Sequence, residues 1–259
     1  MPELPDLQVF SRNLTRLLKG KTLQEISLPV TRKTTATAKE LNEALGGKKL
    51  KEVARIGKQL CMDFGKGSKL FMHLMLHGKL VLQEPAAEEP GHVIAALNFK
   101  DQVLYLADYQ KSAHLILNPP ESESVDALSR KLTARWLAGQ LGGSRAKIKA
   151  VLMDQKVIAG IGNAYADEIL WEARIAPQSV AGRIPAAAVQ KLARSIGKVL
   201  GHAEKQILKQ QPGLISGEIR DFLKIHNPRK KSSPTGGKIV TASVGGRTTY
   251  YTNEQIVYQ

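Results

Sequence analysis

The first six residues, MPELPD, place a proline directly after the initiator methionine. A small residue at position 2 favours removal of that methionine, which would leave the nitrogen of Pro2 as a free secondary amine. Such an amine is a nucleophile able to attack an electrophilic carbon and form a covalent intermediate. Many chains begin with a small residue for no catalytic reason, so this stretch alone leaves both interpretations open.

A second stretch suited to chemistry is GIGN, residues 160–163, which opens the segment NAYADEILWEA. A glycine-rich turn before a helix leaves backbone N–H groups and the positive end of the helix dipole free to bind a phosphate. Asn163 is also of a type favoured as a helix N-cap, and a capped helix can still bind phosphate. The stretch is not a dinucleotide fingerprint, because no strand precedes it and no third glycine follows.

The charge of the chain points to a polyanionic partner. The formal net charge is +15 at pH 7 and the pI is near 9.9. Such a field attracts nucleic acid first and anionic membranes second. A basic helix with Arg145, Lys147 and Lys149 is expected just before the glycine turn. Charged helix faces are often merely solvated, but two helices around a tight turn in so basic a chain favour DNA.

Composition excludes several classes of protein. With 259 residues, 42% of them hydrophobic, the chain can bury the core of one large domain or two ordinary ones. No apolar run approaches the roughly 20 residues that span a bilayer, and the start has the pattern of neither a signal nor a transit peptide. The single cysteine, Cys61, excludes an internal disulfide framework and fits a reducing cytosol. We expect a soluble, cytoplasmic protein that binds nucleic acid.

The elements that must position these residues differ between the two halves of the chain. A helix is predicted over residues 7–19, followed by about eight short strands between residues 22 and 118. This pattern predicts an antiparallel β-sandwich with a helix. From residue 132 the pattern becomes helical, with four helices separated by short breaks. Two β-rich runs, KIVTASV and RTTYYT, joined by Gly245-Gly246, predict a hairpin near the end.

Four separated stretches now identify a family. MPELPD, RIGKQL at 55–60, GIGNAYADEILW at 160–171 and GGRTTYYT at 245–252 occur in the order of one group of proteins. The chain resembles the formamidopyrimidine-DNA glycosylase and endonuclease VIII family of base-excision repair enzymes over nearly its whole length. The resemblance implies an α+β fold in four parts. These are an N-terminal β-sandwich at 1–118, a linker at 119–131, a helix-two-turn-helix domain at 132–224 and a finger hairpin at 225–259.

The resemblance also implies four catalytic residues. Pro2 would be the nucleophile through its nitrogen, and Glu3 would be the acid that protonates the ribose oxygen or opens the ring. Lys58 would contact phosphate near the lesion and support β-elimination. Arg247, directly after the Gly-Gly turn, would grip phosphate and assist δ-elimination, for which a guanidinium is well suited.

Contacts with the DNA are expected from five further residues. The resemblance places His92, Arg145 and Asn163 at positions that bind the DNA backbone. Lys149 lies on the predicted basic helix, and Gln110 stands where family members have an arginine that fills the vacated base stack.

The first departure from the family pattern concerns metal. Family fingers usually hold zinc with four cysteines, but the aligned places here read Ser232, Thr235, Thr252 and Gln255. Hydroxyl and amide oxygens are poor zinc ligands. We therefore expect no metal and no cofactor, and a zincless finger held by packing and hairpin hydrogen bonds alone.

Other departures concern the residues that insert into the DNA base stack where the damaged nucleotide is flipped out. The usual arginine and phenylalanine are replaced by Gln110 and Ser112, and the usual methionine by Leu76. Tyr109, Leu76 or His77 could act as the wedge, and the sequence does not choose among them.

Two further changes affect the reacting centre and the substrate. Asp6 stands where the family has glutamate, which would retune or weaken the site. The segment after Pro212-Gly213 has little room for the long loop that caps 8-oxoguanine, which favours oxidised pyrimidines.

The leading hypothesis is a monomeric, bifunctional DNA glycosylase and AP lyase that acts on double-stranded DNA with oxidised bases or abasic sites. It would excise a flipped base through Pro2 and cut the strand by β,δ-elimination. The alternative is a damaged-DNA-binding protein of the same fold with weakened catalysis, motivated by the changes at Asp6, Gln110 and Ser112. A simple helix-two-turn-helix module, as in a ribosomal protein, would explain neither the sandwich nor the MPELP start.

Overall fold

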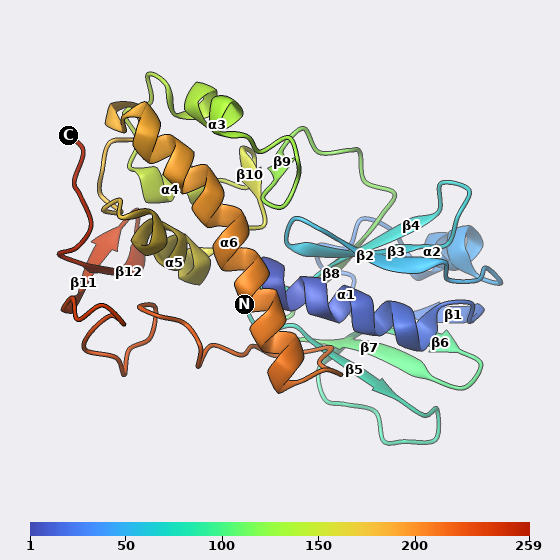
Figure 1. Cartoon of the computed structure of the whole chain (residues 1–259). Coiled ribbons are helices and arrows are strands. Elements are labelled where there is room, and N and C mark those ends of the chain that lie inside the picture. The colour runs from blue at the N-terminus through green and yellow to red at the C-terminus, as the bar shows by residue number, and fades with distance from the viewer. The chain divides into compact units, whose positions relative to one another are not determined.

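The structure is a computed structural model that describes all 259 residues. It divides into two compact units, one made of Met1–Glu121 and Ile207–Glu218, the other of Ser122–Gln206 and Ile219–Gln259. Figure 1 labels their helices and strands. The first unit ends close to the predicted boundary at residue 118. It also includes 207–218, the end of the longest helix and the segment after it, which the sequence assigned to the helical domain.

Two four-stranded antiparallel sheets form the sandwich of the first unit. The strands of the first sheet, in the order β1-β6-β7-β5, are Leu23–Ser27, Val93–Phe99, Val103–Ala107 and Lys79–Gln83. Those of the second, in the order β2-β3-β4-β8, are Glu52–Ile56, Gln59–Asp63, Lys69–His73 and His114–Leu117. All eight predicted strands are present, because each combines an apolar run with a turn signal at its ends.

Helix α1, Leu4–Leu18, carries the chain's first residues onto this sandwich. Leu7, Phe10, Leu14 and Leu18 share one face and are buried in the core that the strands complete. The Thr15 hydroxyl accepts from the backbone N–H of Val53 at 2.8 Å and so fastens α1 to β2. The helix begins three residues earlier than predicted, because Pro5 suits a first helical turn and acidic side chains cap it.

A second helix of the first unit, α2 at Ala38–Leu45, is absent from the sequence-based prediction. Its start carries a capping box, in which Thr37 and Glu40 exchange hydrogen bonds between side chain and backbone. Only Leu41 and Leu45 are buried along it. The T-x-x-E signal was therefore present, but two apolar positions are too few to show a helical period.

The second unit contains the four predicted helices. They are α3 at Ala134–Leu141, α4 at Ile148–Met153, α5 at Asn163–Ala173 and α6 at Ala186–Gln210, with a short 3-10 turn at Ala181–Arg183. Part of the predicted linker is ordered strand, since β9 at Val125–Asp126 pairs in parallel with β10 at Ile158–Ala159. None of the helices combines the length and the hydropathy that a membrane span requires.

The finger hairpin consists of β11, Ile239–Val244, and β12, Arg247–Thr252. Its strands pair in register from Ile239 opposite Thr252 to Val244 opposite Arg247. Gly245 and Gly246 form the two-residue turn with φ of +59° and +71°, as a type I′ turn requires. This confirms the hairpin predicted from the Gly-Gly pair, and Arg247 is the first residue after the turn.

Candidate active site

The start of α1 fixes Pro2 and Glu3. Both are buried, and Glu3 is the N-cap of the helix. The backbone N–H of Glu3 donates to the carboxylate of Asp6 at 2.8 Å, and the Glu3 side chain accepts from the backbone of Asp6 in return. The shorter acid at position 6 therefore still reaches the backbone beside Pro2. A helix start held from both sides gives the Pro2 nitrogen a defined position.

The segment after α6 meets the chain's first residue. The ammonium group of Met1 forms an ion pair with the carboxylate of Glu218. The same segment is fastened twice more within the first unit. Asn13 donates to the carbonyl of Leu214 at 2.8 Å, and the hydroxyl of Ser216 accepts from the N–H of Leu80 at 3.0 Å. Residues 211–218 are thus a short, tied segment and not a long free loop.

Lys58 lies in the same unit, at the tip of the β2–β3 hairpin. Ile56 pairs with Gln59, so the turn has two central residues, and Gly57 supplies the positive φ of +56° that its first position requires. The guanidinium of Arg55 donates to the carbonyl of Gly57 at 3.1 Å and to the side chain of Gln8 at 2.8 Å. These bonds connect the hairpin that carries Lys58 to α1, the helix that Pro2 and Glu3 precede.

His73 is a functional candidate that the sequence analysis missed. It ends β4, and its ring stacks on His114 with 5.5 Å between ring centroids. Burial, then the nearby His114 and Lys58, lower the pKa of His73 from 6.5 to about 4. Its Nδ1 accepts from the N–H of Met75 at 3.0 Å, so the neutral ring carries its proton on Nε2. A neutral donor close to Lys58 suits phosphate or sugar contacts. A histidine within the apolar run KLFMHLML was the available signal.

The remaining first-unit candidates are exposed on loops. His92 lies at the start of β6 with φ of +62°, and Gln110 follows β7. The carboxylate of Asp108 accepts from three backbone N–H groups, those of Gln110, Ser112 and Ala113, at 2.8–2.9 Å. Burial opposes ionisation of Asp108, but these bonds outweigh it and hold its pKa below the usual value. The loop that presents Gln110 is therefore rigidly shaped.

Two of the possible wedge residues are exposed on loops. Tyr109 is 57% exposed and Leu76 is 53% exposed, although both are large and apolar. The ring of His77 contacts that of Tyr109 with 4.8 Å between centroids. Large apolar side chains left in solvent are typical of surfaces that a ligand covers.

Asn163 lies in the second unit, as the first residue of α5. The N-cap is Gly162, so Asn163 does not cap the helix as its type suggested. Instead its Nδ2 donates to the carbonyl of Thr248 at 3.0 Å, directly beside Arg247. The side-chain oxygen of Asn163 is buried without a hydrogen-bond partner. The glycine turn and the finger hairpin therefore meet at this residue.

Lys149 differs from the expectation of a DNA contact. Helix α4 begins at Ile148, so Arg145 and Lys147 precede it and are exposed, whereas Lys149 points inward and its side chain is 1% exposed. Its ammonium contacts the buried carboxylate of Asp167 at 2.7 Å and the hydroxyl of Thr249 at 2.7 Å. A buried ammonium held in this way is not available to a phosphate. Lys149 therefore supports the finger hairpin, because it links Thr249 of β12 to Asp167 of α5.

Arg247 is exposed at the tip of the finger hairpin, and β12 behind it is tied to α5. The N–H of Tyr250 donates to Asp167 at 2.9 Å, and the Tyr250 ring packs edge-on against His226 at 4.7 Å between centroids. Thr249 is fully buried. Tyr250 thus fastens β12 to helix α5.

The finger does not suit zinc. Four positions align with the usual cysteines, and the hydroxyls of Thr235 and Thr252 donate to the carboxylate of Glu254. The Gln255 side chain is engaged with backbone, accepting from the N–H of Thr252 and donating to the carbonyl of Ile175, both at 2.8 Å. No group of three or more His, Cys, Asp or Glu side chains is gathered anywhere to hold a metal ion. Soft ligands are lacking, and the side chains of Thr235, Thr252 and Gln255 already have hydrogen-bond partners.

The four catalytic candidates are divided between the units. Pro2, Glu3 and Lys58 belong to the first unit, and Arg247 belongs to the second. Cys61 is buried in the sandwich, where burial raises the pKa of its thiol to about 11, so it is unreactive.

Sequence comparisons match a separate family domain to each of the two units. Residues 1–115 match the model of the formamidopyrimidine-DNA glycosylase N-terminal domain, and residues 124–211 match that of the formamidopyrimidine-DNA glycosylase H2TH domain. A formamidopyrimidine-DNA glycosylase of Pelotomaculum thermopropionicum is 32% identical over 271 residues, covering 97% of each chain. Another from Carboxydothermus hydrogenoformans is 33% identical over 202 residues, covering 77% of this chain and 76% of the relative.

Solved structures show the same likeness. A complex of wild-type Lactococcus lactis Fpg with DNA containing an oxidised pyrimidine is 26% identical, with a TM-score of 0.85 over 98% of this chain and 99% of that one. A complex of the LlFpg protein with THF-DNA and an inhibitor is 25% identical, with a TM-score of 0.89 over 98% and 100%. The chain therefore belongs to the family of formamidopyrimidine-DNA glycosylases and endonuclease VIII.

Proposed function

We propose that this DNA glycosylase of base-excision repair uses the nitrogen of Pro2 as its nucleophile and combines base removal with AP-lyase activity. The observation that carries the proposal is the start of α1, where Pro2 and Glu3 are buried and a capping box with Asp6 holds them in place. A nucleophile that directly precedes the N-cap of a packed helix is positioned by the core and not by a loop. Loss of Met1 is required, since the nitrogen of Pro2 is otherwise part of an amide.

The first step is attack of the Pro2 nitrogen on C1′ of the damaged nucleotide. The new N–C1′ bond forms as the glycosidic bond breaks, and the base leaves with the electron pair and takes up a proton. Glu3 donates a proton to the ribose oxygen, which opens the ring. Because a secondary amine cannot form a neutral imine, the product is a cationic iminium, which is a good electron sink.

Strand cleavage follows from this iminium. Loss of a proton from C2′ expels the 3′ phosphate by β-elimination, and a second elimination expels the 5′ phosphate. Lys58 supports the first elimination and binds the phosphate beside the lesion. Arg247 grips phosphate from the tip of the finger hairpin and assists the second. His92, Gln110, Arg145 and Asn163 contact the DNA around the lesion.

The substrate we propose is double-stranded DNA with oxidised pyrimidines or abasic sites, processed by a monomer at the nucleoid. A structural relative from Lactococcus lactis was solved with DNA that contains an oxidised pyrimidine. Support from this chain comes from residues 211–218, which Asn13 and Leu80 tie by hydrogen bonds that do not depend on Met1. So short and fastened a segment does not provide the long cap that 8-oxoguanine needs.

The proposal is tested by borohydride trapping on abasic and thymine-glycol duplexes. Protein with a C-terminal tag should form a covalent adduct, whereas the same protein with an uncleavable N-terminal tag should form none. Pro2→Gly, which keeps a primary amine, should trap weakly. Equal trapping by both tagged forms would make another amine, such as that of Lys58, the nucleophile. Binding of both duplexes without any adduct would favour the alternative, a damaged-DNA-binding protein with weakened catalysis.

A further inference from the structure

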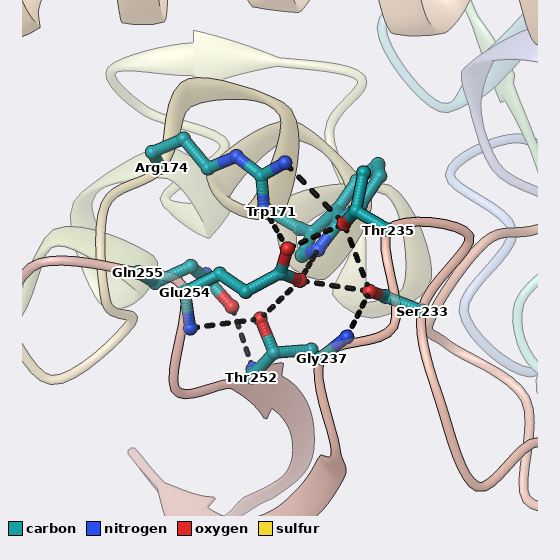
Figure 2. Close-up of polar contacts among 8 residues, drawn as sticks. All are labelled: Trp171, Arg174, Ser233, Thr235, Gly237, Thr252, Glu254 and Gln255. Carbon is teal, nitrogen blue, oxygen red and sulfur yellow. Dashed lines mark hydrogen bonds and ion pairs between the residues drawn. The ribbon is translucent and has the colours of Figure 1, made fainter.

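Glu254 is the centre of a polar cluster in the finger, although it is not one of the four positions aligned with zinc ligands. Its carboxylate accepts hydrogen bonds from four side chains and forms an ion pair with a fifth (Figure 2). The hydrogen-bond donors are Ser233 Oγ at 2.7 Å, Thr252 Oγ1 at 3.1 Å, Trp171 Nε1 at 3.2 Å and the hydroxyl of Thr235, and the ion pair is with Arg174 Nη1 at 2.9 Å. Four hydrogen bonds match the acceptor capacity of a carboxylate, which is about four lone-pair sites.

These side chains come from three separate segments of the second unit. Trp171 and Arg174 end helix α5, Ser233 and Thr235 lie in the turn before the finger hairpin, and Thr252 ends β12. One side chain therefore joins the helix, the entry to the hairpin and its exit. A zinc ion bound by two pairs of ligands, one before and one after the hairpin, would hold together the entry and the exit of the hairpin.

A second layer of bonds keeps the donors in place. The Ser233 hydroxyl accepts from the N–H of Gly237 at 3.0 Å, and Arg174 adopts a left-handed φ of +62° with its guanidinium 4.9 Å above the Trp171 ring. A side chain at Gly237 would overlap the Glu254 carboxylate, since a Cβ there would lie 2.3 Å from Oε2. The Gly236-Gly237 pair thus lets the turn approach the carboxylate closely.

The charges are reversed relative to a zinc site. In a cysteine site the cation is central and the thiolates surround it, whereas here an anion is central and is surrounded by hydroxyls, an indole N–H and a guanidinium. Hydrogen bonds from Thr235 first, with those of Ser233, Trp171 and Thr252, lower the pKa of Glu254 to about 2, although burial opposes this. The carboxylate is therefore charged at every pH at which the protein would work.

We propose that Glu254 is a positioning residue that takes the place of the metal, fixing the finger hairpin on α5 so that Arg247 is presented to the DNA. The path between them is β12 itself, which runs from Arg247 to Thr252 and pairs with β11 along its length. This proposal rests on the proposed role of Arg247 in strand cleavage. It extends the expectation that packing and hairpin bonds alone hold the finger.

The test compares Glu254→Gln with Glu123→Gln, the same change at an exposed acid of the same unit. Glutamine keeps the size of the side chain but turns an N–H₂ group toward the donors and removes the charge. In Glu254→Gln, amide hydrogen exchange of β11 and β12 should rise at least about tenfold, because hydrogen bonds to charged groups are among the stronger ones. The rest of the unit should keep its protection, and Glu123→Gln should match the unaltered protein throughout.

Strand-cleavage activity is measured on DNA with a pre-formed abasic site, for the single variants and the double variant. Arg247→Ala should slow strand cleavage, and Glu254→Gln should slow it in kcat more than in KM. Because Glu254 acts through Arg247, adding Glu254→Gln to Arg247→Ala should cost no further activity. Thr235→Val, which removes one donor and keeps the charge, should show a smaller effect of the same kind if Glu254→Gln fails to fold.

Two results would overturn the inference. Unchanged exchange of the hairpin in both Glu254→Gln and Thr235→Val would show that the cluster does not fasten it. Additive losses in the double variant would show that Glu254 acts on stability in general and not through Arg247. If Arg247→Ala cleaves normally while the hairpin loosens in Glu254→Gln, the proposed role of Arg247 fails and the fastening by Glu254 stands.

Discussion

The buried ion pair between Lys149 and Asp167 gives a quantitative prediction. Lys149→Met keeps the length and the apolar stem of the side chain and removes only the ammonium. The change leaves the carboxylate of Asp167, which is 0% exposed, without its partner at 2.7 Å. Removing one member of a buried pair costs about 3–5 kcal/mol, because the remaining charge is neither solvated nor compensated.

The lower end of that range applies here. Asp167 keeps two other donors, the N–H of Tyr250 at 2.9 Å and the ring of His226 at 2.7 Å. We therefore expect Lys149→Met to lower the free energy of unfolding by about 3 kcal/mol, which for a chain of this size lowers Tm by roughly 10 °C. Adding Asp167→Asn should recover much of the loss, since the unpaired charge is then gone.

Thermal unfolding followed by circular dichroism measures these changes, with Lys147→Met as the matched control. Lys147 is exposed two residues upstream, so its change should alter stability by less than about 0.5 kcal/mol. The reasoning would be refuted if Lys149→Met were as stable as the control and also lowered the salt dependence of DNA binding by about one phosphate. That outcome would restore Lys149 to the DNA contacts.

Four further predictions test other parts of the site. Arg247→Ala should reduce the slope of log K against log salt by about 1, measured by fluorescence anisotropy on an abasic duplex. Because His73 has a pKa of about 4 when folded and 6.5 otherwise, the unfolded chain takes up the proton first. Stability should therefore fall by at most about 3 kcal/mol as pH drops from 6.5 to 4, and urea unfolding of His73→Gln should not show this loss. Treatment with EDTA should leave cleavage intact, and elemental analysis should find far less than one zinc per chain. Of Leu76→Ala and Tyr109→Ala, the one that removes the wedge should lower the fluorescence of 2-aminopurine placed opposite the lesion.

Features that depend on neighbours in the chain could be predicted from the sequence. Each strand of the sandwich carries its own apolar pattern and turn, and Gly245-Gly246 fixes the hairpin turn through its backbone freedom alone. Positions taken from family motifs, such as Pro2 and Lys58, needed no knowledge of packing either. The residues around them did require such knowledge, since the importance of His73 depends on His114, from another strand, and on Lys58, from a hairpin turn.

Lys149 shows why the remaining features could not be predicted. Arg145, Lys147 and Lys149 look alike in sequence, and all three were expected on one basic face. The start of α4 at Ile148 places only Lys149 on the inner side, and the partners that make burial tolerable, Asp167 and Thr249, lie 18 and 100 residues further along. A charge count cannot separate a buried lysine from an exposed one when its counter-ion is so distant in sequence.

Helix α5 explains why the second unit is so rich in buried polar groups. The glycine turn at its start predicts a phosphate site, and the polar residues along the helix hold several other segments of the unit. Asn163 and Asp167 hold β12, through Thr248 and Tyr250. Glu168 accepts from the backbone N–H groups of 224–226 at 2.8–2.9 Å, while burial raises its pKa.

The far end of the same helix completes the arrangement, because Trp171 and Arg174 bind Glu254. A hairpin of two six-residue strands buries too little apolar surface to be stable by itself. A bound metal ion would fasten such a hairpin at a single point. In this chain, several side chains along a single helix fasten it instead. The same helix begins at the glycine turn proposed to bind DNA, so whatever fastens the hairpin also fixes Arg247 relative to Asn163. Loss of the zinc ligands is therefore compatible with a defined position for Arg247.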